Sequence, residues 1–315
     1  MDLDFEQPLR DIQSEIDSLE TRRRKGDSEA SSKLSALRRK LRTETARLYR
    51  SLTPWQTVQV ARHPGRPTIA DYAHRMCDEF LELHGDRFAG DDPAILGGFA
   101  RIGETRFLLL GHRKGGSVDE NIASNFGMAN PEGFRKALRL MRLAAKFGVP
   151  VVTLIDTPGA YPGQTAEERG IAEAIGRNLA EMFTIATPIL TVVTGEGGSG
   201  GALGIAVGDR ILMLEHAVYS VISPEGCASI LWRDGAKAPD AAKALKITAR
   251  DLLDLKIIDG IVPEPVGGAH SAPDEMIATM RATIPEQLKA LSGTSTSRLL
   301  DARYRKYAAI GNYGE

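Results

Sequence analysis

The stretch PILTVVTGEGGSGGALGIA, residues 188–206, joins a short apolar run to an unusually dense group of glycines. Its first six residues, Pro188 to Val193, have the length and the β-branched content of a buried strand. Five of the seven residues from Gly195 to Gly201 are glycine, and small residues through Ala206 then continue as a predicted helix. A strand, a glycine-rich turn and a helix in this order indicate an α/β fold.

Apolar runs of strand length also lie on both sides of this stretch, at residues 106–111, 149–155, 211–214 and 217–222. Residues 131–147, between the first two runs, place Phe134, Leu138, Met141 and Ala145 on one face, as a helix does. Strands that are apolar along their length and alternate with helices predict a largely parallel sheet covered on both faces.

The first 53 residues predict an N-terminal helical hairpin of two amphipathic helices. Gly26-Asp27-Ser28 separates two apolar stripes, which consist of Leu9, Ile12, Ile16 and Leu19 and of Leu34, Leu37, Leu41 and Leu48. A hairpin this thin has little core of its own, so two arrangements stay open. It either packs against the body of its own chain or grips another subunit.

Two further boundaries follow from the pattern. Pro54-Trp55 and Pro64-Gly65-Arg66-Pro67 mark a linker, after which residues 54–284 form the main domain. Residues 285–315 form a charged C-terminal helical tail, for which we expect a solvated helix.

The composition is that of an ordinary globular protein, with 42% hydrophobic and 26% charged residues and a formal net charge of -1. This charge gives no reason to expect binding to nucleic acid or to a membrane surface. No apolar run reaches the ~20 residues that cross a bilayer, and the acidic start lacks the apolar segment of a signal peptide. Cys77 and Cys227 lie far apart and form no CxxC motif, so we expect no disulfide, no metal site and a cytoplasmic location.

A second glycine-rich turn, DTPGAYPG at residues 156–163, also follows a predicted strand and precedes a predicted helix. Backbone N–H groups gather at such junctions, and the helix dipole favours negative charge there. Glycine also lets a ligand approach the main chain closely. The alternative is that the glycines only allow the turn and the helix to pack tightly. The density of glycines from Gly195 to Gly201 favours a binding site.

Several short patterns within residues 195–202 suggest other functions. Gly195-x-Gly197-x-x-Gly200 has the form of the dinucleotide fingerprint, but that pattern usually opens its fold, and here other strand–helix units precede it. The P-loop is excluded because Gly201-Ala202 stands where Lys and Ser or Thr are required.

A serine hydrolase stays open as an alternative. Gly197-x-Ser199-x-Gly201 matches the nucleophile elbow, with His216 or His270 as the base. Elsewhere, His112 and Lys114 end another predicted strand. They are either ordinary polar residues at a loop or, in the case of Lys114, a contact for an anionic phosphate or carboxylate.

Seven segments occur in a fixed order along the chain: GHRKG (111–115), NFGMANPEGFRKALRLMRLA (125–144), IDTPGAYPG (155–163), EERG (167–170), GEGGSGGALGI (195–205), YSVISPEGCASILW (219–232) and IVPEPVGGAH (261–270). Together they resemble the carboxyltransferase α subunit of multi-subunit acetyl-CoA carboxylase, from the helical arm to about residue 290. This resemblance is far more specific than any single glycine pattern.

The resemblance implies a crotonase-like (ClpP/crotonase) fold of stacked ββα units, in which two backbone amides polarise an acyl or ureido oxygen. It also implies transfer of a carboxyl group from carboxybiotin to acetyl-CoA, which gives malonyl-CoA for fatty acid biosynthesis. The amides of Gly197 and Gly198 would then form the oxyanion hole for the biotin ureido oxygen. Further substrate contacts are expected at Gly159, Ala160, Ser199, Gly200 and Gly201.

Several partners are implied by the same resemblance. They are a β subunit of the same fold that carries a zinc ribbon, in an α2β2 complex, a biotin carboxyl carrier protein and biotin carboxylase. The missing CxxC pairs and the absence of a Met-Lys-Met biotinylation site in this chain fit that division of labour. A crotonase-type hydratase or isomerase, with Glu196 and Glu225 beside a thioester, and a purely structural subunit stay as alternatives.

Overall fold

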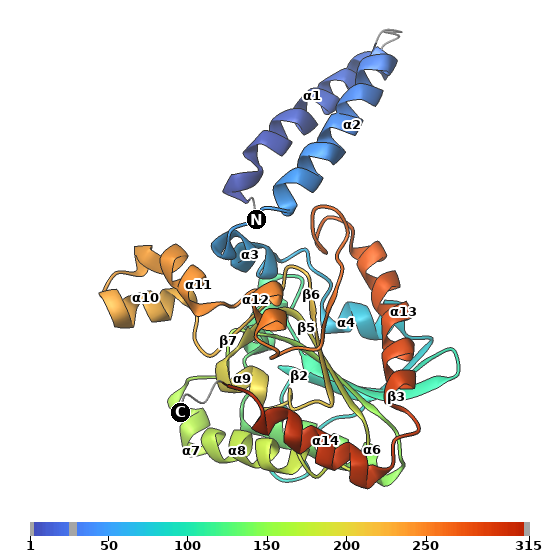
Figure 1. Ribbon diagram of the computed structural model, residues 1–315, viewed down its shortest axis with the longest axis vertical. Helices are drawn as coiled ribbons and strands as arrows, with labels where there is room; N and C mark the ends of the chain where they lie inside the picture. The colour runs from blue at the N-terminus through green and yellow to red at the C-terminus, as the bar shows by residue number, and fades with distance from the viewer. Residues whose placement is uncertain (1–2, 25–29, 312–315) are drawn as a thin grey trace.

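The computed structural model describes residues 3–24 and 30–311, and one eight-stranded sheet organises it (Figure 1). The strand order is β1-β2-β3-β4-β5-β6-β8. Strand β7 is not part of this order but also pairs with β5. The strands are β1 (Glu79–Glu82), β2 (Ile95–Ile102), β3 (Thr105–His112), β4 (Val151–Thr157), β5 (Ile189–Gly198), β6 (Arg210–Leu214), β7 (Val218–Ser220) and β8 (Gly260–Val262). The five apolar runs of the sequence lie in β3, β4, β5, β6 and β7, so the prediction of these strands is confirmed.

The sheet is antiparallel at one edge and parallel elsewhere. β1, β2 and β3 pair antiparallel, whereas β3, β4, β5, β6 and β8 pair parallel, as does β7 with β5. A largely parallel sheet was expected. Because the carboxyl ends of neighbouring parallel strands meet at one edge, the turns after β4 and β5 lie together.

Strand β5 is longer than the sequence indicates. The glycine-rich turn was predicted from Gly195, but residues 195–198 continue the strand and helix α9 (Ser199–Leu203) begins after them. The reason is that β7 joins β5 at this point, with Glu196 opposite Val218 and Gly198 opposite Ser220, which holds the glycines extended.

Helices cover the sheet on both faces (Figure 1). The remaining helices of the main body are α3 (Pro54–Ala61), α4 (Ile69–Asp71), α5 (Val118–Ala123), α6 (Pro131–Lys146), α7 (Gln164–Glu168), α8 (Ile171–Met182), α10 (Pro224–Trp232), α11 (Ala238–Leu245), α12 (Ala249–Asp254), α13 (Pro273–Leu291) and α14 (Thr296–Ala308), with short turns η2 (Tyr72–Met76), η3 (Asn125–Gly127) and η4 (Gly235–Lys237). The predicted helix 131–147 is confirmed as α6, and its Phe134, Leu138 and Met141 are buried.

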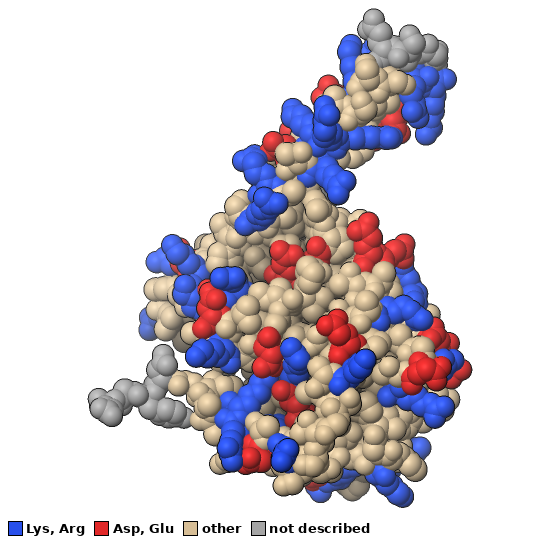
Figure 2. All heavy atoms as spheres, turned by 45° about the vertical axis from the view of Figure 1, so that its right-hand side comes forward, with Lys and Arg blue, Asp and Glu red and all other residues tan. Residues whose placement is uncertain are grey.

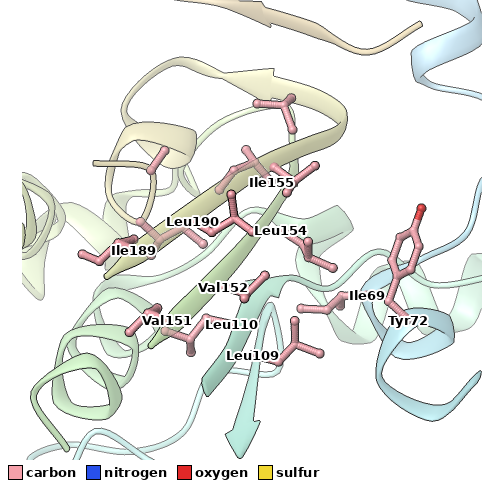
Figure 3. Close-up of a cluster of buried hydrophobic side chains, with 14 of the residues drawn as sticks. Ile69, Tyr72, Leu109, Leu110, Val151, Val152, Leu154, Ile155, Ile189 and Leu190 are labelled. Atoms are coloured by element: carbon pink, nitrogen blue, oxygen red, sulfur yellow. The ribbon is translucent and has the colours of Figure 1, made fainter. Parts of the chain in front are cut away.

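The core lies between the sheet and these helices. In Figure 3 the apolar side chains of β3, β4 and β5 interleave with Ile69 of α4. Asn178 of α8 donates to Phe134 O and Gly204 O, each at 2.9 Å, and so ties α6 and α8 to the end of α9. Burial of these side chains supplies the main stabilising free energy and fixes the strand ends on which the site is built.

The N-terminal segment forms the predicted hairpin, made of α1 (Gln7–Arg24) and α2 (Ala30–Tyr49) after the short turn η1 (Asp4–Glu6). We call α1 and α2 together the arm. Ile16, Leu19, Ala30 and Leu34 form its own small core, while the predicted break at 26–28 lies outside the described residues. The arm projects away from the body (Figure 1). Its lower end contacts the body, where Tyr49 and Leu3 pack on Val60 and Thr45 lies beside Gly267. The lower end of the arm thus contacts its own body, and a grip on another subunit stays a prediction.

The predicted linker at Pro54-Trp55 is wrong, because α3 starts there. Thr53 caps this helix: its hydroxyl accepts from Gln56 N at 3.2 Å, and the Gln56 side chain accepts from Thr53 N at 2.8 Å. With proline in the first turn, this capping box is a strong start signal for a helix. The boundary between residues 53 and 54 nevertheless coincides with the end of the arm.

The C-terminal tail differs from the prediction in two respects. Helix α13 runs through Pro285, so the boundary at residue 285 falls inside a helix. Helix α14 is docked on the body, since the Arg303 side chain is 0% exposed and forms an ion pair with Asp209 at 2.7 Å. The expectation of a solvated helix holds for exposed Arg298 and Arg305 but is wrong for the helix as a whole.

No helix among the described residues has the length and apolarity to cross a membrane. Within the same residues, no group of three or more His, Cys, Asp or Glu side chains could hold a metal ion.

Candidate active site

The two glycine-rich turns lie against each other at the ends of β4 and β5. A Cβ on Gly198 would stand 2.1 Å from Pro158 O, and one on Gly201 would stand 2.2 Å from Gly159 C and 2.4 Å from Ala160 N. The structure thus brings Gly159 and Ala160 together with the segment Gly197–Gly201. These are the residues that the sequence marked for substrate contact.

Ser199 turns the chain from β5 into α9. Its φ of 50° is unusual for a residue with a side chain, and it sits between a strand and a helix. The first N–H groups of a helix have no acceptor within the helix, and Gly198 offers them no side-chain cap. The amides at the start of α9 are therefore available to a ligand oxygen. On the facing turn, the Gly159 N–H already donates to Thr157 Oγ1 at 3.1 Å, which leaves Ala160 as the freer donor of that pair.

A cavity of about 250 Å³ adjoins the first of these turns. It is lined on one side by the β4 end, including Asp156 and Pro158, and on the other by Arg62, Lys114 and Phe126. A Cβ on Gly159 would meet no atom within 4 Å, so there is open space directly beside the first turn. Phe126 holds a φ of 56° between Asn125 at 48° and Gly127 at 77°, a run of left-handed residues. Such strain is typical of functional sites.

Acidic groups neutralise the cations around this cavity. Lys114 Nζ lies 2.6 Å from Asp156 Oδ1, and Arg62 bonds to Glu196 at 2.6 Å and to Glu225 at 2.5 Å. Burial raises the pKa of Glu225, but its bonds with Arg62 outweigh this effect and hold that pKa below its usual range. Because Glu196 and Glu225 share one arginine, neither is free for the acid–base role that a hydratase would give it.

His112 is buried beneath α9. Burial lowers its pKa to about 4, so the ring is neutral at pH 7. Its Nε2 lies 3.1 Å from Gly201 O, a carbonyl that can only accept, and therefore Nε2 carries the proton. His112 supports the start of α9 from below and does not act as the anion contact considered with Lys114.

The histidines proposed for a serine hydrolase are elsewhere. His216 and His270 surround Tyr49 at the base of the arm, with ring centroids 5.4 and 6.3 Å from the tyrosine ring, and neither is hydrogen-bonded to Ser199. Ser199 thus has the strained backbone of a nucleophile elbow without either of these bases.

Sequence reasoning missed three side chains that hold this site. Arg62 and Arg66 were assigned to a linker, and Asp156 was quoted in the first turn without a role. Arg66 is buried and donates to Thr194 O at 2.8 Å, while Asp156 accepts from Glu196 N at 3.0 Å. The available signal was weak: two arginines in a proline-containing segment, and an aspartate near the end of a buried strand.

The fold is the crotonase-like fold, and solved structures that share it include a transcarboxylase, a carboxylase subunit and a malonate decarboxylase. A transcarboxylase 12S structure superposes with a TM-score of 0.55 at 18% identity, over 79% of this chain and 43% of that longer chain. The β subunit of Pseudomonas aeruginosa geranyl-CoA carboxylase gives a TM-score of 0.54 at 16% identity, over 84% and 47%. A Pseudomonas malonate decarboxylase hetero-tetramer in complex with coenzyme A gives 0.56 at 15% identity, over 70% and 89%.

The sequence comparisons identify the family as well as the fold. Residues 2–311 match the family model described as acetyl co-enzyme A carboxylase carboxyltransferase-like. The chain is 52% identical to the acetyl-coenzyme A carboxylase carboxyl transferase subunit alpha of Stenotrophomonas maltophilia (strain K279a), over 99% of this chain and 98% of that protein. It is 51% identical to the same subunit of Prochlorococcus marinus (strain MIT 9215), over 99% and 93%. The chain belongs to the acetyl-CoA carboxylase carboxyltransferase family, as an α-subunit type.

Proposed function

We propose that this chain contributes one half of the active site in which a carboxyl group passes from carboxybiotin to acetyl-CoA. The observation that carries the proposal is the contact between the two glycine turns, which gathers backbone amides beside open space. Family membership supplies the reaction class. The product would be malonyl-CoA, which supplies fatty acid biosynthesis.

The reaction explains why backbone amides dominate the site. Carboxybiotin supplies the activated carboxyl group, and negative charge develops on its ureido oxygen as that group leaves. We assign the Gly197 and Gly198 amides to this oxygen. Preorganised donors of this kind typically contribute ~3 to 4 kcal/mol each. We keep Gly159, Ala160, Ser199, Gly200 and Gly201 as further substrate contacts, which the packing of Gly201 against Gly159 and Ala160 supports. We also keep Lys114, which lines the cavity, as a contact for an anionic group.

The site needs a second polypeptide on this proposal. We assign the facing amides, for the thioester oxygen of acetyl-CoA, to a β subunit of the same fold that carries a zinc ribbon. The complex would be α2β2, served in the cytoplasm by a biotin carboxyl carrier protein and biotin carboxylase. The arm, which projects from the body and carries its own small core, is the element available to grip another subunit.

Reconstitution tests the proposal. Purified alone, the chain should form no malonyl-CoA from acetyl-CoA and carboxylated carrier. Mixed with the β subunit of the same organism, it should form malonyl-CoA, and the β subunit alone should not.

Two outcomes would count against this function. The first is carboxyl transfer by this chain without a partner. The second is hydration or hydrolysis of acyl-CoA by this chain alone. Labelling of Ser199 by a fluorophosphonate would favour the hydrolase instead, since the Ser199 backbone has the shape of a nucleophile elbow.

A further inference from the structure

Strand β5 carries two extra residues just before the glycines of the site. Ile155 of β4 lies opposite Val193, but two positions later Thr157 lies opposite Gly197, four positions along β5. Residues 194–196 therefore bulge out of the β4–β5 ladder. Bulges of this kind re-aim the residues that follow them and are frequent next to active sites.

The same three residues also mark a change of partner on the other side of β5. Up to Val193 the neighbour is β6, with Val193 opposite Met213, and from Glu196 onward it is β7, with Glu196 opposite Val218. Thr194 and Gly195 thus lack a paired residue in any neighbouring strand of the described sheet. Their backbone groups must find other partners, because unpaired buried amides and carbonyls are costly.

Side chains from outside β5 bond to backbone groups of the bulge, at Thr194 O and at Glu196 N. Arg66 donates through Nε and Nη2 to Thr194 O, at 3.2 and 2.8 Å. Asp156 Oδ1 accepts from Glu196 N at 3.0 Å. Asp156 also lies directly over the bulge, because a Cβ on Gly195 would stand 2.5 Å from the same oxygen. The carboxylate replaces the backbone acceptor that a regular ladder would offer.

Each of these side chains is itself fixed by an ion pair. Arg66 forms two bonds with Glu264, at 2.7 and 2.9 Å, and the side chain of Glu264 is fully buried. Burial raises the pKa of Glu264, but the Arg66 guanidinium outweighs burial and lowers that pKa to about 2, so the pair stays charged. On the other side, Lys114 Nζ holds Asp156 Oδ1 at 2.6 Å.

We propose that Asp156 is a positioning residue for carboxyl transfer. By accepting the Glu196 N–H it sets the shape of the bulge and so the direction of the Gly197 and Gly198 amides. Arg66 fixes the other end of the bulge through Thr194 O, and Lys114 holds Asp156 in place. This inference rests on the proposed function, because it concerns how the amides of that site are aimed. Its structural part, the dependence of the bulge on the carboxylate, stands apart from the reaction.

The test compares three variants of the full α–β complex. Asp156→Ala removes the acceptor, whereas Asp156→Asn keeps an oxygen that can accept from Glu196 N. Asp78→Ala is the matched control, because Asp78 likewise accepts a backbone N–H, that of Gly103 at 2.7 Å, and pairs with Arg281 at 2.6 Å. It lies before β1, at the far edge of the sheet from the glycine turns.

Two readouts are needed. Amide hydrogen exchange over residues 195–198 should quicken in Asp156→Ala and stay slow in Asp156→Asn and Asp78→Ala. In carboxyl transfer, kcat should fall about tenfold or more in Asp156→Ala with little change in the KM for acetyl-CoA, since the interaction lost acts on the transition state. Asp156→Asn should recover most of that loss.

The outcomes are distinguishable. Unchanged exchange in Asp156→Ala, or an unchanged kcat, would overturn the positioning role. An equal loss of kcat in Asp156→Asn and Asp156→Ala would also overturn it, because the retained acceptor would then have no effect. If Asp156→Ala does not fold, the asparagine variant still decides, since the proposal requires wild-type exchange there. A wild-type complex without carboxyl transfer would refute the proposed function. The hydrogen-exchange result would then still test whether the bulge depends on the Asp156 carboxylate.

Discussion

The glycines of the two turns fall into two physical kinds. Gly198 and Gly201 are required by packing, since a Cβ at either would stand within 2.2 Å of the facing backbone. Gly159 has no such neighbour, because a Cβ there would enter open space. Substitution of Gly198 by valine would therefore displace the turn and test packing together with catalysis. A substitution of Gly159 therefore distinguishes the two explanations that the sequence left open, a binding site and glycines that only allow tight packing.

Gly159→Ala should leave the fold intact and weaken the use of the carboxylated carrier. The added methyl meets no protein atom, but it occupies the space that we assign to substrate. A methyl forced into a filled site typically costs 1–3 kcal/mol, so kcat/KM for the carrier should fall by about 5-fold to about 150-fold. Steady-state carboxyl transfer with varied carrier concentration measures this effect.

Gly176→Ala provides the control for that substitution. Gly176 is an exposed residue of α8 whose Cβ would likewise meet nothing within 4 Å, and it lies outside the site. Its replacement should leave transfer unchanged and stabilise the helix slightly, by up to about 1 kcal/mol. A Gly159→Ala enzyme as active as Gly176→Ala would show that no substrate fills the space beside the first turn.

At the scale of elements, α14 shows how a charged helix can be part of the core. Leu299, Arg303 and Tyr307 lie four residues apart and so share one face. Arg303 sits at the centre of this face and bonds to Asp209 and to three carbonyls, those of Met182, Ile185 and Thr187. The guanidinium thus supplies hydrogen-bond donors to the backbone carbonyls of the segment from the end of α8 to the start of β5. The four-residue spacing predicts that these side chains share a face. The arginine at the centre of that face, however, suggests that the face is exposed to solvent.

Arg303→Ala should destabilise the chain strongly. It leaves Asp209 as a buried carboxylate without its cation and three carbonyls without their donor. Breaking a buried pair in this way typically costs 3–5 kcal/mol. Urea unfolding should show this as a large decrease in the midpoint concentration.

Arg305→Ala, on the same helix, is the comparison. The Arg305 side chain is 77% exposed and, among the residues that the structure describes, forms an ion pair only with Asp301 of its own helix. Its removal should change the free energy of unfolding by no more than about 0.5 kcal/mol. Equal effects of the two substitutions would mean that α14 is not docked through Arg303.

The arm is the element whose form was predicted and whose placement was not. The two leucine-rich stripes were enough to predict both helices, since they form the small core of the arm. Their pattern contains no information on whether the arm lies along the body. On the face that Figure 2 shows, Lys and Arg side chains cover much of the arm, and none of the exposed large apolar side chains of the described residues lies in it.

At the scale of the whole molecule, the apolar runs were sufficient to predict five of the strands and the parallel sheet. Strands β1, β2 and β8 were missed because two of them are short and β2 contains glycines within its apolar pattern. The adjacency of the two glycine turns followed from strand order. The side chains that hold the bulge did not, because Arg66 and Asp156 bond to β5 from 128 and 40 residues away in the sequence, and no local pattern indicates such contacts.

The stability of the whole chain should fall as the pH is lowered from 7.5 to 5. Burial, above all, lowers the pKa of His112 to about 4, and it also lowers the pKa values of His216 and His270. Histidine in the unfolded chain titrates near 6.5, so below that pH the unfolded state binds protons that the folded state does not. His112 alone should then reduce the free energy of unfolding by on the order of 2 kcal/mol at pH 5.

This pH window isolates the histidines from the carboxylates. Buried acids such as Glu264, whose pKa is lowered to about 2 in the folded chain, lose their stabilising effect only as the pH falls below the unfolded value near 4.3. Urea unfolding at pH 7.5, 6.5 and 5.5 should therefore show a decline that begins near 6.5. A free energy of unfolding that stays constant over this range would mean that these histidines are hydrated, and His112 would then not be the buried neutral donor that holds Gly201 O at the start of α9.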